Sequence, residues 1–371
     1  MLSLMALASW LLGCPPSPGE QGSSRQEGQA AEEHAVREDG GAAASPEAYE
    51  LRAEDWQLYQ ARFVRPEGRV VDTGNGEITH TEAQGYAMLL AVAYDDPETF
   101  DRLWSWTQEN LGVREDNLFA WKWQEEPDAA GNHVPDPNNA TDGDLLIAWA
   151  LSKAGRRWER SELTEAARWI AADVRTKLVV ESPHGPLLLP GEVGFEREDG
   201  PVVNLSYWCF PALDAMQGVD PDPVWEKLTA SGLHLLRTAR YGRWSLPPNW
   251  LAAGGEKPAP AEGFPPHFGY EGIRIPLYLI WSGRTDADLL EPFLDFWNYF
   301  EGARFLPVWT DLSNDAVDSH DAPGGIKSIV ELSRAAAAGK PAELPDLERG
   351  DDYYSSSLLM IVKLAALELE P

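Results

Sequence analysis

Apolar residues recur at spacings of three and four positions along most of the chain, from about residue 49 to residue 369. This period is that of an α-helix that buries one face, so the pattern predicts a series of helices. Turn signals such as Asp95-Asp96-Pro97 separate them, and Pro97 also suits the first turn of the next helix. The predicted helices span residues 82–94, with Thr81 as cap, a stretch from Pro97, and residues 142–154, 161–177, 206–217, 223–240, 270–281, 286–300 and 353–369.

The helices follow one another in pairs, with no clear run of alternating strands, which favours an all-α fold of antiparallel helix hairpins. A closed ring of six inner and six outer helices, an (α/α)6 barrel, fits a domain of this size. Helix count alone does not separate this ring from a superhelical repeat, but no period of sequence identity supports the repeat. The connections at residues 125–139 and 246–266 are longer than a tight bundle needs, and loops of that length tend to build sites.

The charge of the chain restricts its partners. It has 60 acidic and 30 basic side chains, and the formal net charge is -30. Such a charge repels nucleic acid phosphates and anionic lipid head groups, so we expect no nucleic acid partner and favour a neutral or cationic one.

Tryptophan and cysteine usage narrow the chemistry. Sixteen tryptophans are a heavy load, and beyond those in the core their flat faces suit the C–H faces of sugar rings. The two cysteines, Cys14 and Cys209, give no disulfide framework, and Cys209 is most simply a buried thiol. No Cys/His cluster has the spacing of metal ligands, so we expect neither a metal site nor a cofactor.

Residues 1–14 resemble a bacterial lipoprotein signal. Their apolar run is too short to span a bilayer as a permanent helix, and it ends in Leu11-Leu12-Gly13-Cys14, which is similar to a lipobox. Cys14 is then the expected acylated residue, and Pro15 after it permits sorting to an outer membrane. An ordinary cleaved signal and a mis-assigned start are the alternatives.

A tether and one folded domain follow the signal. Residues 15–48 contain almost no large apolar side chain and read as a flexible, disordered tether, because they cannot bury enough surface to fold. Residues 49–371 form the predicted domain. We therefore expect a periplasmic or outer-membrane protein that touches the membrane only through an N-terminal lipid.

Three acidic residues stand where predicted helices begin. Glu82 follows a threonine cap, although a lone glutamate there would only complement the helix dipole. Asp142 opens a strongly apolar helix with a second carboxylate two residues later, and one of the two could be a cap. Glu271 lies one turn before Arg274, with which it could form a helical ion pair.

Together these segments resemble glycoside hydrolase family 8, the inverting family of the endoglucanases that accompany bacterial cellulose synthases. The resemblance runs from about Arg62 to Ala366. Its motifs are Thr81-Glu82-Ala83-Gln84-Gly85-Tyr86, similar to Ser-Glu-Gly-Gln-Gly-Tyr of the family, Ala140-Thr141-Asp142-Gly143-Asp144 with Ile147-Ala148, Leu118-Phe119-Ala120-Trp121-Lys122-Trp123, Asn204-Leu205-Ser206-Tyr207, Leu246-Pro247-Pro248-Asn249-Trp250 and Tyr270-Glu271-Gly272-Ile273-Arg274.

The resemblance implies a ring of paired helices with a long sugar-binding cleft across one end. Glu82 falls on the general acid of the family, and Asp142 on the aspartate that contacts the sugar at the cleavage point. Glu271 stands where relatives usually carry an aspartate as general base, and Asn249 stands where they carry aspartate, so a charge at the cleft edge is lost. In such a reaction an acid protonates the leaving oxygen while a second carboxylate activates water from the opposite face.

The aromatic residues of the matched loops are the candidates for substrate binding. Trp104, Trp106 and Trp149, at helical spacing, are instead expected in the core. Arg274 could orient Glu271 or cap a helix pair. The predicted substrate-binding residues are Tyr86, Trp121, Trp123, Tyr207, Trp250 and Arg274.

The sequence thus predicts an inverting endo-β-1,4-glucanase that acts on cellulose or a related β-glucan, in the context of cellulose synthesis and export. The same fold acting on xylan, mixed-linkage glucan or chitosan is an alternative within enzymes. A non-catalytic glucan-binding protein is an alternative of a different class, suggested by the altered residues Glu271 and Asn249.

Overall fold

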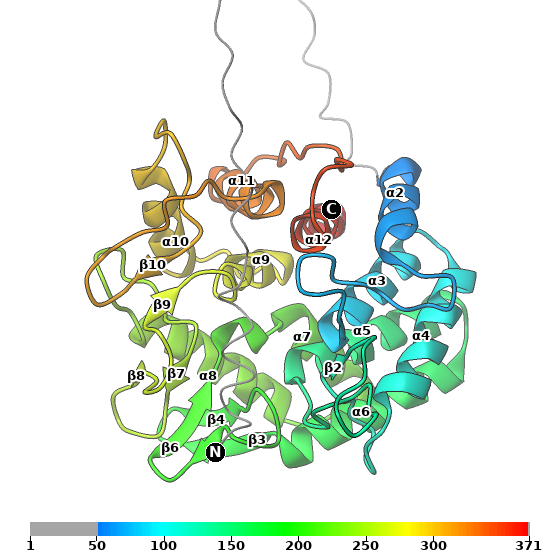
Figure 1. Ribbon diagram of the computed structural model, residues 1–371. Helices are drawn as coiled ribbons and strands as arrows, with labels where there is room; N and C mark the ends of the chain where they lie inside the picture. The colour runs from blue at the N-terminus through cyan, green and yellow to red at the C-terminus, as the bar shows by residue number, and fades with distance from the viewer. Residues whose placement is uncertain (1–50, 370–371) are drawn as a thin grey trace, which may run out of the picture.

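The computed structural model describes residues 51–369, whose helices are arranged as a ring (Figure 1). The predicted signal at residues 1–14, with Cys14, and the predicted tether at residues 15–48 lie outside the described residues. Within the described range, no helix combines the length and the apolar character that crossing a bilayer requires.

Eleven α-helices and one short 3-10 helix, η1, contain about half of residues 51–369. Seven of the predicted helices agree with observed ones to within a few residues at each end. The helices are α2 (Ala53–Phe63), α3 (Thr81–Ala93), α4 (Pro97–Leu111), α5 (Thr141–Arg157), α6 (Ser161–Lys177), η1 (Leu205–Tyr207), α7 (Phe210–Val219), α8 (Val224–Thr238), α9 (Arg274–Trp281), α10 (Ala287–Tyr299), α11 (Gly324–Ala338) and α12 (Tyr353–Leu369).

Burial divides the helices into an inner and an outer set. Helices α3, α5, α7, α9 and α12 are buried on most sides, whereas α2, α4, α6, α8, α10 and α11 bury one face. The inner helices contact one another in the order α3, α5, α7, α9 and α12, and α12 returns to α3. This closed ring agrees with the predicted all-α (α/α)6 barrel, although the described residues contain five inner helices where six were expected.

The close contact of α3 and α5 depends on two glycines. A Cβ atom at Gly85 would lie 2.6 Å from the Cβ atom of Leu146, and one at Gly143 would overlap the hydroxyl of Thr81. Any larger residue at these positions would hold the two helices apart. The glycines therefore bring together the N-terminal ends of α3 and α5, which carry the first two acidic candidates.

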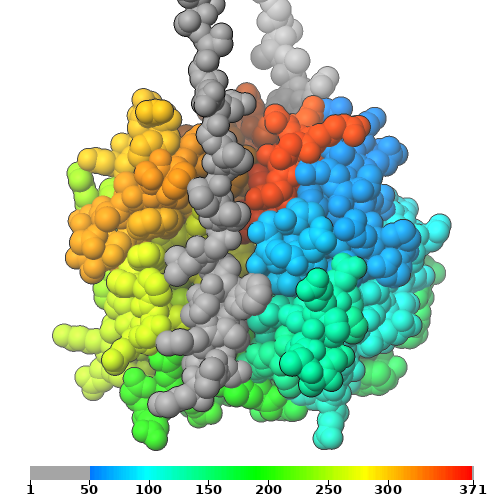
Figure 2. Space-filling view, viewed as in Figure 1, coloured from blue at the N-terminus to red at the C-terminus, as the bar shows by residue number. Residues whose placement is uncertain are grey.

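The ring closes where α2, the first described helix, meets α12, the last one. Lys363 donates to Asp55 in an ion pair that is almost completely buried, and Asp55 also accepts from the backbone N–H of Leu347. The Tyr59 hydroxyl lies 3.0 Å from the Ser357 hydroxyl across the same contact. Figure 2 shows the blue N-terminal residues lying against red residues near the C-terminus.

The loops between the helices contain short antiparallel strands, which the hydrophobic pattern did not predict. A strand of two residues is too short to show the alternation that identifies one. The pairs are β1 (Thr79–His80) with β2 (Lys122–Trp123), β3 (Val179–Ser182) with β4 (Gly185–Leu188), and β9 (His267–Phe268) with β10 (Thr310–Asp311), while β5 (Glu196–Arg197), β6 (Gly200–Val203), β7 (Leu251–Ala252) and β8 (Ala259–Pro260) form one sheet in this order.

Two predicted helix starts are wrong, and two helices were not predicted. The predicted helix at 206–217 is η1 followed by α7, which begins at Phe210 with Pro211 in its first turn. The predicted helix at 270–281 begins four residues later, at Arg274, because residues 269–273 form a turn. Helices α2 and α11 lie outside the predicted ranges.

Candidate active site

A cavity at the N-terminal ends of α3 and α5 contains all three acidic candidates. Of the predicted substrate-binding residues it includes every one except Trp123. Its other walls come from the start of α12 and from the loops before α3 and α9. The lining residues are Asp72, Asn75, Ile78, His80, Thr81, Glu82, Tyr86, Trp121, Ala140, Asp142, Tyr207, Trp250, Tyr270, Glu271, Arg274, Tyr353, Tyr354, Ser357 and Leu358.

Glu82 lies in the first turn of α3, and its carboxylate is held by two donors. Its Oε1 atom accepts from the Tyr86 hydroxyl at 3.0 Å and from Nη1 of Arg274. With Oε1 occupied on both sides, a proton on this carboxyl group resides on Oε2. The predicted cap Thr81 is wrong, because His80 is the N-cap and its Nδ1 accepts from the backbone N–H of Ala83.

Arg274 connects the first two acidic candidates. Its guanidinium is buried; Nη1 bonds Glu82, while Nη2 lies 3.1 Å from the Ser206 hydroxyl and 3.8 Å from Oδ2 of Asp142. The ion pair with Glu271 that the helical spacing suggested is replaced by these contacts, and of the two alternatives for Arg274 its side chain does not supply the orientation of Glu271. Glu271 precedes the first turn of α9, so the helical spacing does not apply.

Asp142 and Asp144 face different surroundings although they are two residues apart. Asp142 lines the cavity, and its Oδ1 accepts from the backbone N–H of Gly143 at 2.8 Å. Asp144 is outside the cavity lining and accepts from the backbone N–H of Phe119 at 3.0 Å and from the Asn139 amide at 2.8 Å. Burial raises the pKa of both carboxyl groups to about 7. Asp144 therefore holds loops in place, and Asp142 is free to meet a ligand.

Glu271 lies in the turn at residues 269–273 and is only 6% exposed. Its Oε1 accepts from the indole N–H of Trp250 at 3.1 Å. Burial raises the pKa of Glu271 to about 7, and the Trp250 hydrogen bond opposes this effect. Near neutral pH the group is present in both protonation states, which suits a residue that accepts a proton from water.

The predicted stacking residues have different roles in the structure. The Trp250 ring packs between Phe195 and Phe264, with centroid distances of 5.6 and 4.7 Å, so it supports the Glu271 carboxylate more than it offers a free face. Trp123 stacks on His133 at 4.9 Å, outside the cavity lining. Trp121 and Tyr207 line the cavity.

The predicted core residues agree with the structure. Trp106 and Trp149 are buried, Trp104 packs against the core, and Cys209 is a buried free thiol.

Eleven further lining residues were not predicted as part of the site, and five of them have aromatic or ionisable side chains. The adjacent pair Tyr353 and Tyr354 opens the last helix, where two aromatic residues could have indicated a site. Tyr270 lies within a quoted motif, whereas Asp72 stands in a loop with no pattern. His80 Nε2 lies 3.6 Å from Oδ2 of Asp72, so these two side chains form one corner of the cavity.

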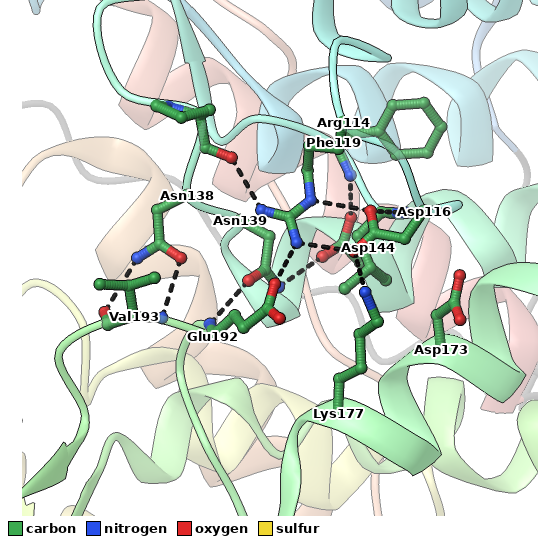
Figure 3. A network of polar contacts seen from close by, with 12 residues as sticks. Arg114, Asp116, Phe119, Asn138, Asn139, Asp144, Asp173, Lys177, Glu192 and Val193 are labelled. Carbon is green, nitrogen blue, oxygen red and sulfur yellow. Dashed lines mark hydrogen bonds and ion pairs between the residues drawn. The ribbon is translucent and has the colours of Figure 1, made fainter.

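A polar network next to the cavity holds three loops together (Figure 3). Arg114 forms a bidentate pair with Asp116 at 2.8 and 2.7 Å and also contacts Glu192, while Lys177 bonds Asp116 at 2.6 Å. Asn138 exchanges two hydrogen bonds with the backbone at residue 193. Bidentate arginine pairs are geometrically specific, so the network makes these loops rigid.

A second cavity of about 750 Å³ borders this network. Lining residues of the two cavities contact each other and form the wall between them. Trp121 of the first cavity donates to Asp136 of the second at 3.2 Å, and Phe195 and Phe264 of the second pack on Trp250. Within residues 51–369, no group of three His, Cys, Asp or Glu side chains is placed to hold a metal ion.

Comparison with known proteins gives consistent matches over most of the chain. The sequence profile of glycosyl hydrolases family 8 matches residues 41–368. The chain is 40% identical over 330 residues to a "Probable endoglucanase" of Novacetimonas hansenii, covering 88% of this chain and 94% of the relative. It is 37% identical over 289 residues to an endoglucanase of Cellulomonas uda, covering 78% of each.

Two solved structures share the fold at substantial identity. An endo-β-1,4-glucanase from Acetobacter xylinum matches with a TM-score of 0.79 and 39% identity, covering 85% of this chain and 98% of that one. A family 8 endoglucanase from Klebsiella pneumoniae matches with a TM-score of 0.80 and 36% identity, covering 85% and 100%.

The raised pKa of Glu271 predicts that Glu271→Gln stabilises the fold in alkali. Glu271 has a pKa of about 7 in the folded chain, against an ordinary value of 4.5. Its contribution to the free energy of unfolding is therefore fully present below about pH 4.5 and is lost as the pH rises through 7. That difference corresponds to about 3 kcal/mol above pH 8. Urea unfolding should therefore show the variant more stable than the wild type at pH 9 and nearly equal to it at pH 4.5.

Glu226→Gln is the matched control, since Glu226 is exposed on α8. Because Glu226 lies in the first turn of α8, its substitution should lower the free energy of unfolding by less than about 1 kcal/mol at pH 9, and by less still at pH 4.5. Equal stabilities of wild type and Glu271→Gln at pH 9 would contradict the effect of burial.

Proposed function

Because this chain belongs to glycosyl hydrolases family 8, we propose that it is an inverting endo-β-1,4-glucanase that hydrolyses cellulose or a related β-glucan. As a member of that family it is a glycoside hydrolase. The observation that carries the proposal is that Glu82 and Asp142 share the Arg274 guanidinium in the same cavity as Glu271. The endoglucanase names of the relatives support a β-glucan as substrate.

In the proposed reaction Glu82 is the general acid and Glu271 the general base. Glu82 gives its proton to the glycosidic oxygen as the bond to the anomeric carbon breaks. Glu271 takes a proton from a water molecule whose oxygen attacks that carbon from the opposite face. After the reaction Glu82 is ionised and Glu271 is protonated. Proton exchange with solvent water returns both groups to their starting states for the next cycle.

Asp142 and the aromatic walls position the sugar in this proposal. Asp142 is buried beside the acid and has one carboxylate oxygen near Arg274, so it can accept a hydrogen bond from a sugar hydroxyl at the cleavage point. Trp121 and Tyr207 offer rings to the C–H faces of the sugar. Trp250 holds Glu271 through its indole N–H.

Glu82→Gln tests the acid. The amide keeps the shape of the side chain and can still contact Arg274, but it has no proton to give, so hydrolysis of carboxymethyl cellulose should fall by roughly 10²–10⁴-fold. Binding of the same polymer should be retained. Reducing-end release measures the first and affinity electrophoresis the second.

A variant that keeps more than about a tenth of the activity would remove Glu82 from the acid role. Polymer binding by a wild type that releases no reducing ends would instead indicate a non-catalytic glucan-binding protein. Glu226→Gln serves as the control for a carboxylate removed from the surface.

Glu271 and the stereochemistry of the product test the base. Glu271→Gln should abolish turnover because an amide cannot take a proton from water, whereas Glu271→Asp should remain active. The first product from a β-linked oligosaccharide, followed by NMR, should be the α-anomer. Near-wild-type rates in Glu271→Gln would move the search for the base to Asp142, since Asp144 does not line the cavity, and a β-anomeric first product would rule out inversion.

We also propose that a lipid on Cys14 holds the enzyme in the periplasm or at the outer membrane, where it acts on glucan during cellulose synthesis and export. The apolar run that ends in Leu11-Leu12-Gly13-Cys14 supports this location. In a Gram-negative host, Cys14→Ser should convert a detergent-extracted protein into a soluble one, because it removes the thiol that carries the lipid. Membrane fractionation followed by immunoblotting measures the change, and an unchanged membrane fraction would contradict the lipid anchor.

A further inference from the structure

One side chain from a distant part of the chain closes the turn that carries Glu271. Oδ1 of Asn249 accepts from the backbone N–H of Gly269 at 3.0 Å and from that of Gly272 at 3.2 Å. The two donors stand on either side of Glu271 in the sequence. This amide oxygen therefore helps to fix the turn and the direction in which Glu271 leaves the backbone, together with the backbone hydrogen bonds of the turn and the Tyr354 hydroxyl, which donates to the carbonyl of Tyr270.

Asn249 is itself well anchored. Its backbone N–H donates to the carbonyl of His267 at 2.7 Å, and the residue after it, Trp250, donates to the Glu271 carboxylate at 3.1 Å. Trp250 leads directly into β7 of the four-stranded sheet and packs between two phenylalanine rings. Two consecutive residues thus hold Glu271 at both ends, one through the backbone turn and one through the carboxylate.

The choice of an amide over a carboxylate at this position has an electrostatic consequence. An aspartate at 249 would accept the same two N–H groups, but it would add a negative charge next to Glu271 and so disfavour the ionised form. Glu271 already faces Asp142 from α5, and it is close to Tyr207 of η1 and Tyr354 of α12. The cation in the cavity lining, Arg274, is engaged by Glu82 and Asp142.

We propose that Asn249 is a positioning residue for the base: its amide oxygen helps to fix the turn around Glu271, and its neutrality adds no charge that would hinder ionisation of that carboxylate. The inference rests on the proposed role of Glu271. It gives a reason why asparagine suits a chain whose base is a buried glutamate, since an aspartate would hold the same turn but add a negative charge beside that glutamate.

The test uses the full chain with Asn249→Ala and Asn249→Asp, and measures kcat, KM and the pH profile of kcat/KM on carboxymethyl cellulose. Asn249→Ala leaves two N–H groups without their acceptor, so kcat should fall at least about tenfold while KM stays within about twofold. Asn249→Asp keeps an acceptor for both N–H groups, so its kcat at alkaline pH should return from the Asn249→Ala value to that of the wild type. The acid limb of its profile should move upward by about half a pH unit or more, because the added charge makes Glu271 harder to ionise.

Asn314→Asp is the matched control, because the Asn314 side chain also accepts a backbone N–H, from Ala316 at 2.9 Å, but in an exposed loop. It should leave kcat and the pH profile unchanged. A wild-type kcat in Asn249→Ala, or an unshifted acid limb in Asn249→Asp, would overturn the inference. If Asn249→Ala does not fold, as judged by circular dichroism, Asn249→Asp still decides it, since both acceptor bonds are retained.

Failure of this inference can be told apart from failure of the proposed function. If Glu271→Gln is inactive while both Asn249 variants behave as the wild type, Glu271 remains the base and only the role of Asn249 is wrong. If Glu271→Gln is active, the base assignment itself fails, and the inference fails with it.

Discussion

The buried guanidinium of Arg274 is the group on which the arrangement of the site depends. A charge removed from water is tolerated only where carboxylates and polar atoms surround it. Arg274 reaches Glu82 on α3 and Asp142 on α5, and it also contacts the Ser206 hydroxyl on η1, so these three elements must converge at the start of α9. The glycines between α3 and α5 make that convergence sterically possible. Without the guanidinium, two carboxylates would face each other with no positive charge between them.

The same convergence makes the centre of the barrel electrostatically unfavourable. Asp142, Asp144 and Glu271 are all buried, and the pKa of each is raised to about 7 because burial disfavours the charged form. For Glu271 this is useful in the proposed reaction, since base catalysis works best when the pKa lies near the working pH. Asp144 has a structural role instead, because it accepts hydrogen bonds from two loops. Stability lost at the centre is compensated by helices that are buried on most sides.

Loops complete the site, and they are held by features too local to see in a hydrophobic pattern. The two-residue strands β1 and β9 lie just before Glu82 and Glu271, and the Arg114 network fastens the loops beside the cavity (Figure 3). The predicted loop at residues 125–139 supplies a wall of the second cavity, as the length of the connection suggested. The ring of helices is a rigid scaffold, and hydrogen bonds and ion pairs hold the loops at one end of it. The side chains of the site are therefore well positioned although the loop sequences show no recognisable hydrophobic pattern.

The sequence by itself determined the paired helices and the positions of Glu82, Asp142 and Glu271, because helical period and short motifs are local properties that neighbouring residues specify. It also separated the core residues Trp106 and Trp149 from the tryptophans of the loops. Only the tertiary structure decided that Arg274 pairs with Glu82 rather than Glu271, that Trp250 supports Glu271, and that Asn249 closes a turn twenty residues away. These contacts join residues that are far apart in the chain, and the direction of a side chain across such a distance depends on how the helices pack, which no local pattern records.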